Sequence, residues 1–289
     1  MLENKIDFFV VVSVKDANPN GDPLNGNRPR EDFEGFGEIS DVCLKRKIRN
    51  RLQDAGESIF VQSDDRAQDG YSSLKERADK ELKEAGKDKE KYAKLACEKW
   101  IDVRSFGQVF AFKDAKKKEE GGEVDKGVSI GIRGPVSIHP ALSVSPVDII
   151  SLQITKSVNS EPTKDGTKSS DTMGMKHRVR FGVYTFAGSI NCQLAEKTGF
   201  GSGDAQKIHD AICTLFENDT SSARPEGSMA VEKVYWWTHN SKNGQYPSIK
   251  VHKQVDVKLK EDVEIPKSMK DYEITYQPLP DLETEIYEL

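Results

Sequence analysis

The sequence lacks the features that mark membrane and secreted proteins. No apolar run approaches the roughly 18 residues that a membrane-spanning helix needs, and the mean hydropathy is −0.65. The first residues, Met1 to Lys5, lead directly into a short apolar strand without the pattern of a signal peptide. We therefore expect a cytoplasmic protein with no membrane partner.

Cysteine and histidine are scarce, and their spacing fits no metal site. The four cysteines form no C-x-x-C pair, and the five histidines form no H-E-x-x-H pair. The sequence also shows no G-x-S-x-G motif and no carboxylate cluster beside a histidine that would indicate a catalytic centre. We expect free, buried thiols, no metal, no cofactor and no catalytic residues.

Charge is distributed unevenly along the 289 residues, whose net charge is −5. Residues 256–289 form an acidic tail with ten Asp or Glu and four Lys or Arg, so the rest of the chain is close to neutral. Two segments are basic: residues 40–55, with five basic and two acidic residues, and residues 128–182, with seven and four. These segments are the candidates for contact with a polyanion such as nucleic acid.

Hydrophobic periodicity predicts an α+β fold. The β-branched and aromatic run Ile6 to Val14 is typical of a strand buried on both faces. Ser40 as N-cap and Gly56 as the residue after the C-cap delimit a helix from Asp41 to Ala55. The other predicted elements are strands at 106–112, 128–137, 178–190 and 230–238 and a helix at 204–218. Once the insertions are removed, the remaining order β-α-β-β-α-β predicts a ferredoxin-like or RRM-like antiparallel sheet with both helices on one face and the other face free.

The remaining segments interrupt this single domain of residues 1–289. Residues 57–101 are highly charged with helical periodicity, which indicates a helical insertion. Residues 113–127 have almost no apolar side chains, which predicts a mobile loop. Residues 159–175, rich in Ser, Thr, Lys, Asp and Gly, interrupt two extended stretches as the tip of a long hairpin would.

Several motifs have both a functional and a structural explanation. The loop from Asn18 to Pro23 could offer amides to a phosphate or could be a plain surface turn. The basic residues of the helix at 41–55 could lie along a phosphate backbone or could only face solvent. The turn Gly199 to Gly203 resembles a phosphate cradle without the Walker A lysine. Trp236 and Trp237 could stack on bases, although strand alternation favours burial in the core.

Five stretches together resemble one known family. They are N-P-N-G-D-P from Asn18, D-V-C-L-K-R-K-I-R-N from Asp41, D-V-R-S-F-G from Asp102, I-R-G-P-V-S-I from Ile132 and T-M-G-M-K-H-R-V-R-F-G-V-Y from Thr172. In this order, from the first strand to about Thr238, they resemble the CRISPR-associated Cascade backbone subunits of the subtype I-C kind, which belong to the RAMP superfamily.

This resemblance implies a modified RRM palm, a helical finger-like insertion and a β-hairpin thumb at residues 154–178. It implies a non-catalytic subunit whose copies assemble helically along one CRISPR RNA (crRNA). Base pairing with target DNA reads the sequence, while the protein holds the RNA backbone. The expected partners are therefore crRNA, target DNA through the crRNA, other copies of the chain and other Cascade subunits. We expect the acidic tail at 256–289 to pack on a neighbouring subunit or to be exposed.

The resemblance also assigns residues by position. It places RNA-binding groups in the loop after the first strand, in the basic helix, in the palm and at the thumb. In that order they are Asn18, Asn20 and Gly21; Lys45, Arg46 and Arg49; Arg104 and Arg133; and Lys176, His177 and Arg178. Met173 is the candidate wedge that separates stacked bases, as apolar side chains can. We expect joint replacement of Lys45, Arg46 and Arg49 to weaken RNA binding without unfolding the chain.

Two other functions remain open from the sequence. Asp16, Asp22 and Asp32 gather around the first loop and could bind a divalent cation, which would permit metal-dependent cleavage of guide-paired RNA. Loop carboxylates that only favour turns explain the same residues. A self-assembling protein without any nucleic acid is the second alternative.

Overall fold

An antiparallel sheet of eight strands forms the centre of the computed structural model, which describes residues 1–86, 88–111, 129–155 and 173–289. Its strands are β1 (Ile6–Ala17), β4 (Phe36–Ile39), β7 (Val136–Ile138), β8 (Ala141–Pro146), β9 (Ile149–Thr155), β10 (Met173–Ile190), β11 (Met229–Thr238) and β14 (Glu283–Glu288). The order is β14-β11-β1-β10-β8-β4, and β7 and β9 also pair with β10. The structure is therefore of the α+β class, as predicted.

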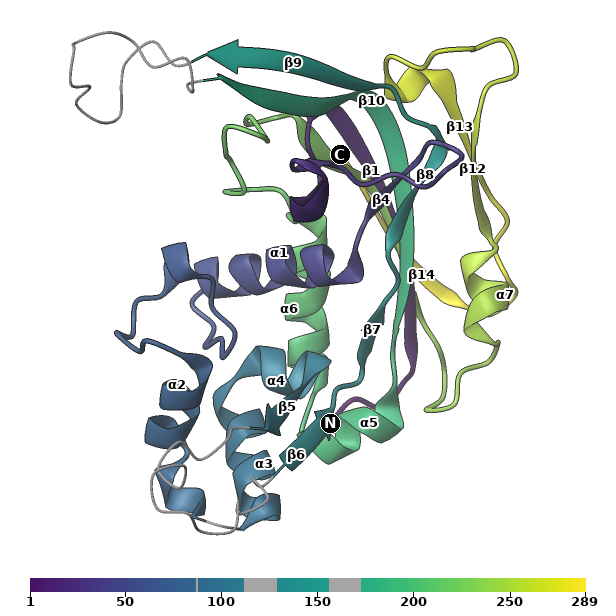
Figure 1. The fold of residues 1–289 in the computed structure, drawn as a ribbon. Coiled ribbons are helices and arrows are strands. Elements are labelled where there is room, and N and C mark those ends of the chain that lie inside the picture. Colours follow the sequence, from purple (N-terminus) through teal and green to yellow (C-terminus); the bar gives the residue numbers. More distant parts are fainter. Residues whose placement is uncertain (87, 112–128, 156–172) are drawn as a thin grey trace, which may run out of the picture.

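Helices cover one face of this sheet. The helices α1 (Asp41–Asp54), α5 (Cys192–Thr198) and α6 (Ser202–Cys213) bury their apolar stripes against Phe8, Val10, Val12 and Val14 of β1 (Figure 1). Ser40 caps α1 through its hydroxyl, and Gly56 beyond its end has a φ of 85°. The predicted strands at 6–14 and 230–238 are thus confirmed as β1 and β11, and the predicted helices at 41–55 and 204–218 as α1 and α6, within a few residues at each end.

The predicted strands at 106–112 and 128–137 do not join the main sheet as expected. The strands β5 (Gly107–Ala111) and β6 (Ser129–Arg133) pair only with each other, in a separate two-stranded sheet. The second prediction merged β6 with β7, although Gly134 and Pro135 separate them. A Cβ on Gly134 would lie 2.2 Å from the carbonyl oxygen of Ser105, so the chain turns here where only glycine fits. In the main sheet, β1 pairs with β10 on one side and with β11 on the other.

A helical lobe surrounds this small sheet. It contains α2 (Leu74–Glu81), α3 (Lys89–Lys99) and α4 (Ile101–Phe106), below α1 in Figure 1. The ring of Phe60 lies 4.7 Å from that of Trp100 and 5.1 Å from that of Phe110, between centroids. These residues form a hydrophobic cluster separate from the core under the main sheet.

The other face of the sheet is covered, contrary to the expectation that it would be free. The helix α7 (Ser248–His252) and the strands β12 (Val255–Leu259) and β13 (Tyr272–Tyr276) lie across it (Figure 1). Val255 and Tyr272 are buried against Trp237 and Phe181 respectively, and β14 extends the sheet beside β11. Much of the acidic tail therefore packs on its own sheet, because its alternating apolar residues bury the second face.

A buried carboxylate joins this covering segment to the central strand. Asp7 of β1 is fully buried and accepts a hydrogen bond from Nε2 of His239 at 2.8 Å. Nζ of Lys5 lies 2.9 Å from the same carboxylate, and Nε2 of His252 on α7 lies 3.3 Å from its second oxygen. The backbone N–H of Gln245 donates to Nδ1 of His239, so Nε2 carries the proton that bonds Asp7.

The remaining short elements lie in connections. They are β2 (Gly21–Asp22), β3 (Arg28–Pro29) and the 3₁₀ turns Pro23–Asn25, Asp64–Arg66, Lys83–Ala85 and Met269–Asp271. The predicted mobile loop at 113–127 lies outside the described residues, as does most of the predicted hairpin tip. Where the structure describes the chain, none of its helices is both long and apolar enough to cross a bilayer.

Candidate nucleic-acid interface

The loop after β1 is tied to the start of α1. Oδ1 of Asn20 accepts hydrogen bonds at 2.9 Å from both the backbone N–H and the hydroxyl of Ser40, the N-cap. Asn18 is buried and donates from its amide to the carbonyl of Asn27 at 2.7 Å. A Cβ on Gly21 would lie 2.9 Å from that same carbonyl oxygen. All three predicted residues therefore shape the loop, and the side chains of Asn18 and Asn20 already have partners within the protein.

The predicted basic outer face of α1 is not open to solvent. Lys45 pairs with Asp41 one turn earlier at 2.8 Å, and Arg46 donates to the carbonyl of Val61. Nε of Arg49 donates at 2.9 Å to the buried carboxylate of Asp102 at the start of α4. Burial, and after it the charge of Arg49, lowers the pKa of Arg46. The helix lies between α6 and the lobe, so Arg46 and Arg49 face the lobe and not a solvated groove.

This packing changes the expectation for replacement of the basic residues. Arg49 is 12% exposed, and its partner Asp102 is fully buried. Among the residues that the structure describes, Arg49→Ala leaves Asp102 with only the backbone N–H groups of Phe60 and Val61 as hydrogen-bond donors. We expect this variant to lower the free energy of unfolding by about 2–4 kcal/mol, because the buried carboxylate of Asp102 loses its positively charged partner. Urea denaturation followed by circular dichroism measures the change.

The matched control for this measurement is Lys45→Ala. Its pair with Asp41 is local and more exposed, so the loss should stay below about 0.5 kcal/mol. Equal stability of the two variants would contradict a structural role for Arg49. The sequence-based expectation that joint replacement of Lys45, Arg46 and Arg49 spares the fold considered only their position off the apolar stripe. The ion pair between Arg49 and buried Asp102 argues against it.

The strands β9 and β10 project from the body as a two-stranded ribbon (Figure 1). Their register places His177 opposite Ser151, Lys176 opposite Leu152 and Gly174 opposite Ile154. Because successive strand residues face opposite sides, Met173, Met175 and His177 share one face. Lys176 and Arg178 share the other face with Leu152 and Ile154. The predicted trio of Lys176, His177 and Arg178 is thus divided between two faces.

The loop after β1 meets the base of this ribbon. Nη1 of Arg28 donates to the hydroxyl of Ser151 at 3.1 Å, and that hydroxyl lies 2.8 Å from Nδ1 of His177. On the other face, Nε of Arg178 lies 3.4 Å from the carboxylate of Asp16, whose backbone φ is 52°. Sequence reasoning did not identify Arg28 or Ser151, because the contact joins residues 123 positions apart. Arg28, His177 and the two methionines therefore lie along one edge of the molecule.

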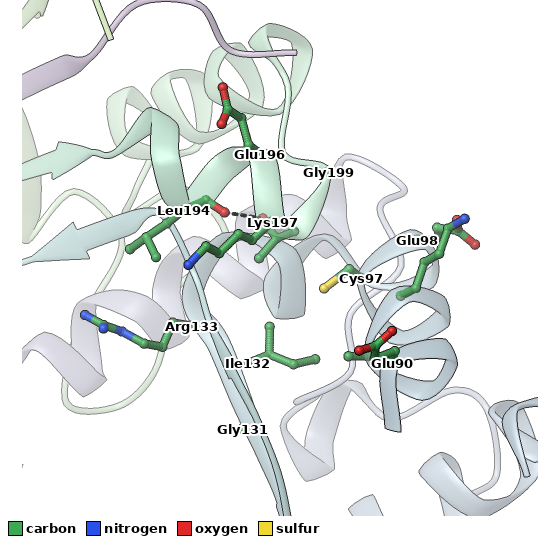
Figure 2. A pocket seen from close by; sticks show the side chains of 13 residues that line it. Glu90, Cys97, Glu98, Gly131, Ile132, Arg133, Leu194, Glu196, Lys197 and Gly199 are labelled. Atoms are coloured by element: carbon green, nitrogen blue, oxygen red, sulfur yellow. Dashed lines mark hydrogen bonds and ion pairs between the residues drawn. The ribbon is translucent and has the colours of Figure 1, made fainter. Parts of the chain in front are cut away.

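The other two predicted arginines lie at the opposite end of the molecule. Arg104 of α4 forms a two-pronged ion pair with Asp204 of α6, with N–O distances of 2.8 and 3.1 Å. Arg133 ends β6 and lines a cavity of about 660 Å³ between α3, β6 and α5 (Figure 2). Figure 1 shows the ribbon and the lobe at opposite ends, with α1 between them. The structure does not bring Arg104 or Arg133 beside Met173.

The three carboxylates of the first loop have local partners. Asp22 caps a 3₁₀ turn by accepting from the N–H of Leu24, and Asp32 accepts from the N–H groups of Glu34 and Phe36. Asp16 faces Arg178. Among the described residues, no three Asp, Glu, His or Cys side chains gather as a metal site would require. Asp22 and Asp32 thus have the turn-forming role that the sequence left open as an alternative, and Asp16 forms an ion pair.

Two further motifs have structural roles. At the glycine-rich turn, Gly199 ends α5 with a φ of 76°, and the carboxylate of Asp204 accepts from the N–H of Gly201 at 3.0 Å. Asp204 thus occupies the helix N-terminus that a phosphate would need. Trp236 and Trp237 are both buried, on opposite faces of β11. Burial of both tryptophans in the core is thereby confirmed.

Comparison with known proteins gives one consistent family. The family model described as CRISPR-associated protein Cas7 matches residues 4–277. A protein of Haloferax volcanii described as CRISPR-associated protein Cas7 is 27% identical over 229 residues, which cover 76% of this chain and 66% of that relative's length.

Two chains of solved structures also align. One belongs to a CRISPR RNA-guided surveillance complex, pre-nicking, with 16% identity, a TM-score of 0.44 and coverage of 81% of this chain and 78% of that chain. The other belongs to a CRISPR RNA-guided surveillance complex, with 16% identity, a TM-score of 0.38 and coverage of 81% and 68%.

Proposed function

The chain belongs to the Cas7 family of CRISPR-associated proteins, and from this premise we propose that it is a non-catalytic backbone subunit of a Cascade effector complex. Several copies bind one crRNA side by side and present its bases to target DNA. Other Cascade subunits complete the complex. The subtype I-C kind stays a prediction from the motifs.

One observation carries this proposal: the β1 loop, the start of α1 and the base of the ribbon meet. There Arg28 and His177 lie on the same side of the ribbon as Met173 and Met175. A guanidinium and an imidazole can bind phosphates while thioether side chains contact bases. This edge of the chain is therefore the RNA surface, and Asn18, Asn20 and Gly21 hold its loop in shape.

The ribbon is the thumb, and Met173 is its wedge. Met173 is 60% exposed and Met175 54% exposed, although both are large and apolar. Two apolar side chains on one face of a projecting ribbon can enter between stacked bases, as wedge residues do in nucleic-acid complexes. Lys176 and Arg178 face the other side, so they contact a different part of the complex than the unstacked base. The proposed RNA surface does not include Arg104 and Arg133.

The body is a modified RRM palm. Along the chain, β1, α1, β7, β10, α6 and β11 follow one another in the order β-α-β-β-α-β. In the sheet these strands have the order β11-β1-β10-β7, and both helices lie on one face, as in an RRM-like unit. The lobe of α2, α3 and α4 is the finger-like insertion. The acidic C-terminal segment covers the face that would otherwise be open, so the RNA lies along the ribbon edge and not across the sheet.

Purification from cells with and without a CRISPR array tests this function. We expect a large particle on size-exclusion chromatography that contains RNA of discrete length only when the array is present, and that falls apart after nuclease treatment. Filaments unaffected by nuclease would favour a self-assembling protein without nucleic acid. Cleavage of guide-paired RNA that requires Mg²⁺ and is lost in Asp22→Ala would favour the ribonuclease.

A further inference from the structure

A rigid tip on the loop before β4 presents a fully exposed aromatic ring. Phe33 is 98% exposed. The carboxylate of Asp32 accepts hydrogen bonds at 2.9 Å from the N–H groups of Glu34 and Phe36, and the N–H of Asp32 donates to the carbonyl of Phe36 at 2.9 Å. The carbonyl of Gly35 accepts from the N–H of Val147 at 2.9 Å, which braces the tip on the main sheet.

Such a tip is prepared for binding before any partner arrives. An aromatic ring on a hydrogen-bonded turn loses little conformational freedom when it is buried, and buried aromatic anchors supply much of the energy of protein interfaces. Isolated apolar side chains at the surface are common, but this one occupies the end of a turn that its own neighbours fix. The tip therefore has the properties of an interface anchor.

The charge at the tip favours a protein over nucleic acid as the partner of Phe33, although Glu31 already pairs with Arg28 of the proposed RNA surface. Glu31, Asp32 and Glu34 surround Phe33 in the sequence, and Glu34 is exposed with no ion-pair partner among the residues that the structure describes. A phosphate backbone would be repelled by these carboxylates. A protein surface with an apolar hollow and a basic rim is the complementary partner.

The chain itself has an apolar hollow at its other end, and its rim carries the basic residues Arg133 and Lys197 as well as the acidic residues Glu90, Glu98 and Glu196. The cavity between α3, β6 and α5 has an apolar lining from Ala93, Cys97, Ile132 and Leu194. Figure 2 shows the side chains of Arg133 and Lys197 extending to the same side of this cavity. Both are exposed, and neither has an ion-pair partner in the described part of the chain. Glu90 and Glu98 line the opposite side, which restricts an acidic tip to one orientation.

We propose that the Phe33 tip of one copy docks into the cavity between α3, β6 and α5 of a second copy, with Glu34 facing Arg133 and Lys197. The two surfaces differ and lie on different parts of the molecule, so the contact is heterologous. A heterologous contact whose rotation does not close into a ring produces an open helical array. The contact itself does not depend on the proposed function. The inference rests on that function in one respect, that RNA aligns the copies in the assembled complex.

Sedimentation velocity of the full chain without RNA, over a range of concentrations, tests the contact independently of RNA binding. We expect Phe33→Ala to weaken self-association at least tenfold, as loss of an anchor residue does. Leu24→Ala is the matched control, because Leu24 is also 98% exposed but lies on the turn between β2 and β3, outside the tip. It should leave self-association unchanged.

Charge exchange identifies the two surfaces. Glu34→Lys and Lys197→Glu should each weaken self-association, and the double variant should recover most of the loss. The proposal is overturned if the unmodified chain shows no self-association, if Phe33→Ala matches it, if Leu24→Ala weakens it equally, or if the double variant is no better than the single ones. Absence of RNA from the purified particle would instead count against the proposed function and leave this result standing.

Discussion

Replacement of Asp7 by asparagine is expected to lower the free energy of unfolding by about 3–5 kcal/mol, the range measured when one member of a buried ion pair is removed. The side chain keeps its size, so no cavity forms. The loss arises because Lys5 and the imidazoles of His239 and His252 are left without a buried negative charge. Chemical denaturation monitored by tryptophan fluorescence measures this change.

The same carboxylate makes stability depend on acidity. Burial alone raises the pKa of Asp7, but the hydrogen bond from His239 and the nearby polar groups of His252, Ser248 and Lys5 outweigh burial, so the pKa lies far below its ordinary value of 3.8. A lowered pKa in the folded state contributes stability that is complete above that ordinary value and is lost as the pH falls below it. The native chain should therefore lose stability more steeply than Asp7→Asn between pH 4 and pH 2.

Asp148→Asn is the control for both measurements. Asp148 is 56% exposed, and its pair with Arg180 spans 3.9 Å, so its replacement should change stability by less than about 0.5 kcal/mol. Two results would contradict the role of Asp7 in joining the C-terminal segment to the sheet. One is an effect of Asp7→Asn no greater than that of Asp148→Asn; the other is a parallel loss of stability below pH 4 in the native chain and in Asp7→Asn.

Replacement of Arg28 by alanine is expected to lower the affinity for RNA about tenfold or more, the effect of losing one charge-assisted hydrogen bond. Arg28 has five N–H donors; Glu31 and Ser151 engage its Nε, Nη1 and Nη2 atoms, and one further N–H on each Nη atom is left for a phosphate. Its side chain is 31% exposed. Fluorescence anisotropy with a labelled single-stranded RNA measures the affinity.

The dependence on salt separates a phosphate contact from a general loss of binding. Removal of one phosphate contact to a single strand should reduce the slope of log affinity against log salt by about 0.7. Lys258→Ala removes the same charge from the C-terminal layer, where Lys258 is 73% exposed and pairs with Asp256, and should change neither quantity. An unchanged slope in Arg28→Ala, or an equal loss in Lys258→Ala, would remove Arg28 from the RNA surface.

Local sequence patterns were enough to predict the central elements. Alternating and continuous apolar residues define β1 and β11, and the Ser40 cap with Gly56 defines α1, because these signals act within a few residues. Pairing of strands is not local. The partner of β5 could not be read from its apolar pattern, since β5 and β6 alternate as main-sheet strands also do. The covering of the second sheet face depends on Val255 and Tyr272, far along the chain.

At the candidate site, too, local patterns were predictable from the sequence and contacts between distant segments were not. Alternation along β10 already implied that His177 and Arg178 face opposite sides, so that part of the prediction could have been sharper. Burial of Arg49 against Asp102 and of Arg104 against Asp204 could not be foreseen, because each pair joins distant segments. A basic helix looks alike whether its arginines meet phosphates or the protein's own carboxylates.

The length of β10 has a mechanical consequence. Strand pairing with β1 ends at Val179, and Met173 to Arg178 continue beyond it without a break in the strand. At about 3.4 Å per residue this overhang is a lever of about 20 Å. A tilt of roughly 10° about its base would move Met173, the proposed wedge, by about 3.5 Å, close to the spacing of successive nucleotides along a strand. A small change in the twist of the sheet would therefore displace the end of this overhang by about the spacing of one nucleotide.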